Sequence, residues 1–146
     1  MQSMFNLSEN TMGKSLLLLL SLAASLPLAH AADLEVGIGS ATGKEGTVYL
    51  ALYDRNGFLR TPLATATASP ANPVAVFHQL SPGAYAVAIF QDLNGNGKLD
   101  RNMAGLPLEP YGFSNNAMGV MGPPDFAAAA VQVAQDRQAI VINLHQ

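Results

Sequence analysis

The chain has no cysteine among its 146 residues. Without cysteine there are no disulfide bonds, no thiolate metal sites and no cysteine nucleophiles. A bacterial lipoprotein carries a lipid-bearing cysteine after its signal peptide, so we do not expect a lipoprotein. The fold must be held together by burial of apolar surface, which a single domain of this size can supply.

Charge is also scarce. Only 12% of the residues are charged, with 7 Lys and Arg against 10 Asp and Glu and a net charge of −3. The basic residues are scattered, and a protein that follows a phosphate backbone needs them gathered in a patch or stripe. We therefore expect no nucleic-acid binding.

Long apolar runs are missing except near the N-terminus. Lys14 is followed by an apolar run over 15–28 and then by Ala-His-Ala at 29–31, the anatomy of a helical secretory signal peptide with a small-x-small cleavage site. The run is shorter than the roughly 20 apolar residues of a membrane span. We predict a signal peptide over 1–31, cleaved near Ala31, and no membrane span in the mature protein.

The residues before Lys14 are polar and include Glu9, whereas a signal peptide begins with a basic region. Met12 is therefore a candidate for the true start. Residues 32–146 are expected to form one domain, periplasmic or secreted.

Alternation with a period of two, and runs of β-branched and aromatic residues, recur along this domain, and both are typical of β-strands. The clearest segments are 34–38, 47–53, 74–78, 84–90 and 139–144. A proline-glycine turn at 81–84 predicts a hairpin between the third and fourth of these. The pattern predicts an all-β fold, a small antiparallel β-sandwich of about six or seven strands with one long ordered loop.

The segment 126–133 is ambiguous, because its alanines favour helix while Val131 and Val133 favour strand. We interpret it as a strand that forms a hairpin with 139–144, and leave a short helix beginning at Asp125 as the alternative.

Residues 91–124 break the alternation and are rich in glycine, proline and asparagine. Such segments inside a compact domain are usually functional or disordered. Apolar residues are spread through this one, so we expect an ordered loop that packs on the sheet edge. Tyr111 and Phe113 are its candidate partner-binding residues, since exposed loop aromatics often form contact surfaces.

The loop opens with DLNGNGKLD at 92–100, which places oxygen-bearing side chains at positions one, three, five and nine and a glycine at position six. Calcium takes six to eight oxygens from carboxylates, amide and backbone carbonyls, and water. A calcium loop of this spacing would use the side chains of Asp92, Asn94, Asn96 and Asp100 together with the backbone carbonyl of Lys98.

Position twelve is Met103 where a calcium loop of the EF-hand type has glutamate, and the flanking segments are not helical patterns. Another acid must complete the shell. Glu109 is the nearest candidate and Asp54 a more remote one. With few negative charges and Lys98 alongside, the predicted affinity is weak, about 10⁻⁴ to 10⁻³ M. The alternative is a metal-free turn in which Asp and Asn bond their own backbone.

Three strings carry a resemblance to a known family. AIFQDLNGNGKLD at 88–100, GLPLEPYGFSNN at 105–116 and GPPDF at 122–126 together resemble the exported bacterial family called domain of unknown function 2141, over roughly 34–144. The resemblance implies a small β-sandwich exported in Gram-negative bacteria, and it implies no catalytic residue. The turn LSPGAY at 80–85 also resembles that of transthyretin-like and carboxypeptidase regulatory-like sandwiches, which are often accessory or binding modules.

No catalytic constellation is recognisable. We therefore expect a non-catalytic exported module that binds Ca²⁺ and presents residues 105–124 to a protein or another envelope component. Two alternatives remain open. One is an envelope hydrolase with Asp92, Asp100 and Glu109 as acid-base or metal groups, and the other is a metal-free structural or interaction domain.

Overall fold

The computed structural model describes residues 31–146, except 42, 44 and 135. Residues 1–30 of the predicted signal peptide lie outside the described residues. The elements in chain order are β1 (Ala32–Gly39), β2 (Thr47–Tyr53), β3 (Ala64–Ala68), β4 (Val74–Leu80), β5 (Gly83–Asp92), β6 (Tyr111–Phe113), the 3₁₀ helix η1 (Ser114–Asn116), α1 (Phe126–Ala129), β7 (Val131–Val133) and β8 (Arg137–Asn143). No helix in this part of the chain is long and apolar enough to cross a membrane.

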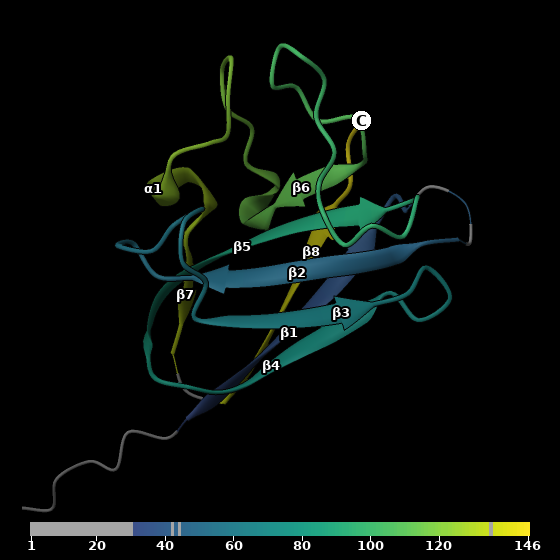
Figure 1. Ribbon diagram of the computed structural model, residues 1–146. Helices are drawn as coiled ribbons and strands as arrows, with labels where there is room; N and C mark the ends of the chain where they lie inside the picture. Colours follow the sequence, from purple (N-terminus) through teal and green to yellow (C-terminus); the bar gives the residue numbers. More distant parts are fainter. Residues whose placement is uncertain (1–30, 42, 44, 135) are drawn as a thin grey trace, which may run out of the picture.

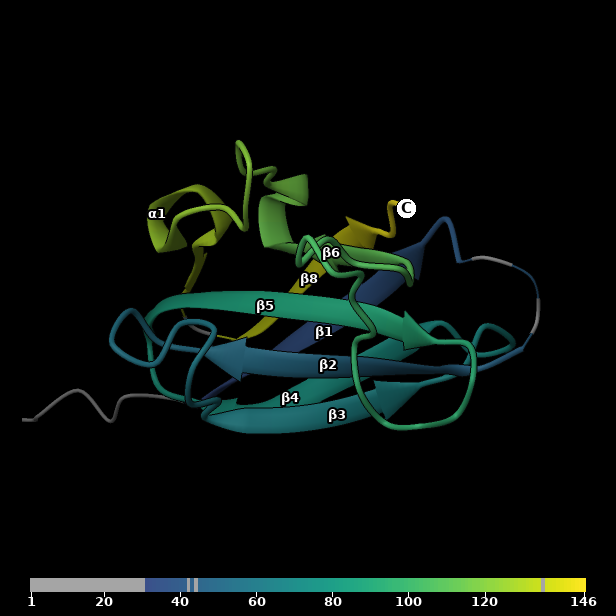
Figure 2. The same cartoon turned by 45° about the horizontal axis from the view of Figure 1, so that its top comes forward.

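The strands form two sheets that pack face to face (Figures 1 and 2). One sheet has the order β4-β1-β8, and the other has the order β3-β2-β5-β6, with β7 also paired to β5. This confirms the predicted all-β sandwich. Its pairs are antiparallel except β1 and β8, which run parallel.

The core follows from the period of two. Every second residue of β1 and of β2 is buried, and these residues meet across the interface between the sheets. In Figure 2 the strands β2, β3 and β5 lie in front, and β1, β4 and β8 lie behind them. The largest fully buried apolar side chains come from both sheets: Leu34, Val36, Val48, Leu50, Leu52, Val87, Val133 and Ile142.

Both predicted hairpins are wrong. β4 pairs with β1 whereas β5 pairs with β2, so the proline-glycine turn carries the chain from one sheet to the other. Likewise β7 pairs with β5, and β8 pairs with β1. A turn signal specifies that the chain reverses, and it does not specify which sheet receives the next strand.

The ambiguous segment 126–133 contains both structures. Its first three alanines lie in the single helical turn α1 and its valines in β7, so the strand interpretation holds only for Val131–Val133. Each residue type follows its own propensity here.

A second apolar cluster covers the outer face of β5. It is built from Ala86 on β5, Phe113 on β6, and Phe126 and Ala129 on α1. The buried Ser114 hydroxyl joins these layers, because it accepts a hydrogen bond from the backbone N–H of Val87 at 2.9 Å and donates to the carbonyl of Ala129. Residues 111–114 of the long segment therefore pack on the sheet.

The strand β6 also links the edges of the two sheets. Tyr111 and His145 exchange backbone hydrogen bonds of 2.9 and 2.8 Å just beyond β8. Gly112 lies where the two chains approach, and a Cβ there would be 2.5 Å from the carbonyl oxygen of Asn143. Only glycine permits this approach.

Candidate metal loop and adjacent cleft

The loop 92–100 is organised by the carboxylate of Asp92, which ends β5 and is only 1% exposed. One oxygen accepts the backbone N–H groups of Gly95 at 2.7 Å and Asn96 at 3.3 Å. The other accepts the N–H of Gly97 at 2.7 Å. Gly95 and Gly97 both have positive φ, 76° and 75°, which glycine adopts without strain. The loop thus winds around one buried acid.

The side chains of the next three candidate ligands converge on one another. The amide group of Asn96 donates to both oxygens of Asp100, at 3.1 and 3.0 Å, and the amide of Asn94 donates to the same carboxylate at 2.5 Å. The side-chain oxygen of Asn94 accepts the backbone N–H of Asn96 at 3.1 Å. The side-chain oxygen of Asn96 accepts the backbone N–H of Lys98 at 2.8 Å. The side chains of Asn94, Asn96 and Asp100 therefore meet at one exposed point, with the amide nitrogens turned toward the carboxylate and the amide oxygens turned toward the backbone.

Glu109 fastens the two ends of this loop together. Its side chain is 5% exposed, and its two oxygens accept the backbone N–H of Leu93 at 2.9 Å and of Asp100 at 3.1 Å. Glu109 is held at this position because β6, which follows it, pairs with β5. The pairing extends to Pro110, whose carbonyl accepts the backbone N–H of Gln91 at 2.8 Å. Glu109 thus lies next to the candidate site, and its carboxylate is hydrogen-bonded to the backbone of the loop.

The other predicted residues are placed as follows. Lys98 lies in the loop, whereas Asp54 follows the far end of β2 and accepts the N–H of Gly57 at 2.7 Å, so it cannot complete the shell. Tyr111 and Phe113 belong to β6 and not to a free loop, with ring centroids 6.1 Å apart, and Phe113 is buried at 8% exposure.

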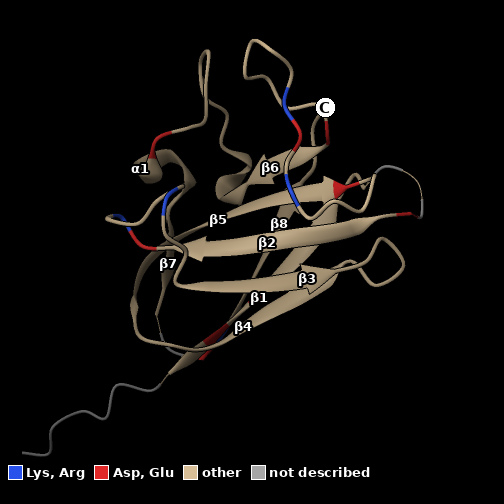
Figure 3. Ribbon diagram, viewed as in Figure 1, with Lys and Arg blue, Asp and Glu red and all other residues tan. Residues whose placement is uncertain are grey.

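The hydrogen bonds within the loop favour the ionised form of Asp92. Burial raises the pKa of Asp92. The hydrogen bonds from the N–H groups of Gly97, Gly95 and Asn96 lower it by more than burial raises it, so the pKa lies below the usual 3.8. A general acid needs a raised pKa, and the pKa of Asp92 is shifted in the opposite direction. Figure 3 shows charges of both signs where the chain leaves β5. Within the described residues no three His, Cys, Asp or Glu side chains form a metal-holding group, so a cation here would depend on amides as well as acids.

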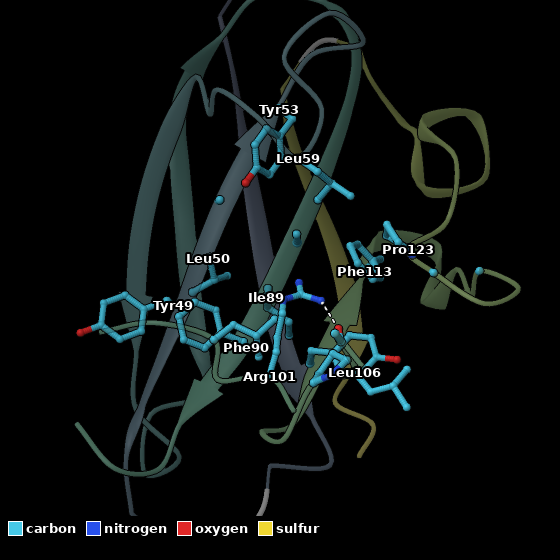
Figure 4. A pocket seen from close by; sticks show the side chains of 18 of the residues that line it. Tyr49, Leu50, Tyr53, Leu59, Ile89, Phe90, Arg101, Leu106, Phe113 and Pro123 are labelled. Atoms are coloured by element: carbon cyan, nitrogen blue, oxygen red, sulfur yellow. Dashed lines mark hydrogen bonds between the residues drawn. The ribbon is translucent and has the colours of Figure 1, made fainter. Parts of the chain in front are cut away.

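A cleft of about 870 Å³ lies beside this loop (Figure 4). Its floor is the outer face of β2 and β5, and its walls come from 97–107 and 119–123. Tyr111 and Phe113 line it together with Arg101, whose guanidinium donates to the carbonyl of Gly105 at 3.0 Å.

Residues 36–141 match the model of a protein family described as "Uncharacterized protein conserved in bacteria (DUF2141)". The chain belongs to this family. No curated protein and no solved structure matches it, so the similarity to transthyretin-like and regulatory-like sandwiches stays a prediction.

The DUF2141 match spans the loop 92–100, Glu109 and the cleft residues, and it assigns no role to any of them. Sequence reasoning missed two features of this DUF2141 sandwich. One is the role of Glu109 as a clamp, and the other is the cleft that Arg101 lines. Both depend on which strands pair with β5, which no local pattern reveals.

Proposed function

We propose that the protein is an exported, non-catalytic β-sandwich module that binds Ca²⁺ at the loop 92–100 and uses the segment after it to bind a ligand or partner. The observation that carries the proposal is the convergence of the Asn94 and Asn96 side chains on the carboxylate of Asp100. Export rests on the signal-peptide pattern of residues 1–31.

The loop supplies oxygens of the kind that calcium requires. Rotating an asparagine amide by 180° exchanges its NH₂ and its oxygen, so the two amides that donate to Asp100 would present two more oxygens there. Together with the Asp100 carboxylate, the Lys98 carbonyl and water, the loop reaches the six to eight ligands of a calcium site. The rotation costs the two bonds that Asn94 and Asn96 accept from backbone N–H groups and the three that their amides donate to Asp100.

The buried carboxylate of Asp92 fixes the backbone conformation of the loop that carries this site. It accepts three backbone N–H groups out of about four acceptor positions on a carboxylate, so it mainly shapes the loop. With Lys98 and Arg101 nearby, the affinity should fall at about 10⁻⁴ to 10⁻³ M, as in extracellular calcium modules.

A metal-free interaction domain is the second candidate function. It is favoured by the same hydrogen bonds, which already satisfy the loop without an ion, and no buried side-chain N or O of the described residues lacks a partner. The two candidates differ in whether calcium competes with the Asn–Asp100 bonds.

Melting temperatures in Ca²⁺, in Mg²⁺ and in chelator distinguish them. Calcium at ten times Kd stabilises a one-site protein by about 1.4 kcal/mol, which corresponds to about 5 °C for a domain of this size. We expect this shift with calcium, and expect Asp100→Ala to abolish it.

The matched control is Asp54→Ala, which removes an Asp side chain from another turn at the far end of β2. It should lower the melting temperature and keep the calcium shift. Equal melting temperatures in calcium and chelator for the native chain would refute the calcium proposal and favour the metal-free domain.

A further inference from the structure

The cleft beside the loop has a floor that follows from strand register. On the outer face of the larger sheet, Ala51 of β2 lies opposite Ala88 of β5, and Thr65 of β3 and Phe113 of β6 continue the row on either side. Three small side chains in adjacent strands leave a hollow about 10 Å wide, since strands are about 4.8 Å apart.

The next row across the same strands is aromatic. Tyr49 lies opposite Phe90, and Phe90 lies opposite Tyr111. The rings of Tyr49 and Phe90 are stacked at 5.2 Å with an angle of 18° between their planes. The hollow therefore has a flat aromatic wall on one side, and Tyr53 and Leu59 bound it on the other (Figure 4).

Exposed apolar side chains on two loops rise above this floor. Leu106 is 57% exposed and Met121 is 101% exposed, and both line the cleft from opposite walls. In Figure 1 the two loops project from the same side of the sandwich. Flexible methionine side chains suit adaptable apolar binding surfaces.

The charge of the cleft is of one sign. Among the described residues that line it, Arg101 is the single cation and none is a carboxylate. Figure 4 shows the Arg101 side chain among the residues that line the cleft. One of its N–H groups is engaged with Gly105, and a guanidinium has five donors in a planar fork that matches a carboxylate.

We propose that this cleft binds a small organic acid with a planar apolar body. The ring system lies on the Ala51–Ala88 floor against Tyr49 and Phe90, and the carboxylate pairs with Arg101. The volume of about 870 Å³ falls within the 300–1,000 Å³ typical of small-molecule sites, which combine apolar walls with a few polar groups. This proposal needs no calcium, since none of its contacts involves Asp100 or the loop amides.

The test uses 2-naphthoate and 2-naphthol, which share one ring system and differ in charge at pH 7. The chain has no tryptophan, so naphthyl fluorescence reports binding without tryptophan emission. We expect saturable 2-naphthoate binding with a Kd on the order of 0.1 mM and at least about tenfold weaker binding of 2-naphthol, because the charge-assisted pair is lost.

Two variants separate the parts of the site. Arg101→Gln should weaken 2-naphthoate about tenfold and leave 2-naphthol unchanged. Ala88→Leu, which fills the hollow, should abolish binding of both. The matched control is Arg60→Gln, because Arg60 also donates to a backbone carbonyl four residues away, that of Asn56 at 3.1 Å, and does not line the cleft. It should bind both probes as the native chain does.

The proposal is overturned if 2-naphthoate shows no saturable binding to the native chain. It is equally overturned if Arg101→Gln, an exposed change that leaves the core intact, binds 2-naphthoate as well as Arg60→Gln does. A concentration-dependent dimer that Ala88→Leu dissociates would show a second copy of the chain in the cleft, and would also overturn it. None of these results depends on calcium, so the calcium proposal stands or fails separately.

Discussion

Replacing Glu109 by glutamine keeps the shape of a buried side chain and removes one of its two acceptors. In the native chain its carboxylate accepts the N–H groups of Leu93 and Asp100, which lie at the two ends of the loop. Glutamine can accept one of these bonds through its carbonyl and must face the other N–H with its own NH₂. The change therefore costs one charge-assisted bond and weakens the second.

The magnitude follows from the hydrogen bonds. A bond to a charged group contributes about 1.5–3 kcal/mol and a neutral one about 0.5–1.5 kcal/mol. We expect Glu109→Gln to lower the free energy of unfolding by about 2–4 kcal/mol, measured by urea denaturation. The melting temperature should fall by about 10 °C.

Glu35→Gln is the matched control, because it makes the same chemical change in an exposed ion pair with Arg137. Such pairs contribute about 0–1 kcal/mol. If Glu109→Gln costs no more than Glu35→Gln, then Glu109 does not clamp the loop and the reasoning fails.

Three further changes test other parts of the fold. Ser114→Ala leaves the buried N–H of Val87 without its acceptor, and we expect a loss of about 2 kcal/mol in urea denaturation, whereas no loss would contradict its linking role. Gly112→Ala places a methyl group against the carbonyl of Asn143 and should cost about 1–3 kcal/mol in the same assay; an unchanged stability would argue against the close approach of β6 to the other sheet. Because the folded pKa of Asp92 lies below 3.8, its contribution is present above pH 3.8 and is lost as the pH falls through the folded value. Asp92→Asn should therefore be less stable at neutral pH and lose less stability in acid; acid melting curves parallel to those of the native chain would contradict this.

The sequence reveals the strands whose faces differ most. Five of the predicted strands correspond to β1, β2, β4, β5 and β8, which show either alternation or runs of β-branched and aromatic residues. The segment β3 was missed because Ala64–Ala68 alternates alanine with threonine, two small residues with little contrast. The three residues of β6 are too few to show a period.

Local sequence patterns do not reveal which strands pair with each other. The spacing of Asn94, Asn96 and Asp100 predicts that their side chains meet, because all three lie in one short loop. The clamp at Glu109 arises only when β6 pairs with β5, and the hollow above Ala88 arises only from the register of β2 on β5. These contacts join residues far apart in the chain.

The most direct test of the calcium site follows the side-chain amide signals of Asn94 and Asn96 by NMR during a Ca²⁺ titration. Both NH₂ groups donate to Asp100 in the metal-free loop, and calcium binding requires them to turn away. We predict that both signals shift together and saturate at about millimolar calcium, and that Asp100→Ala removes the effect. Signals that stay fixed up to about 10 mM calcium, well above the expected Kd, would contradict the account.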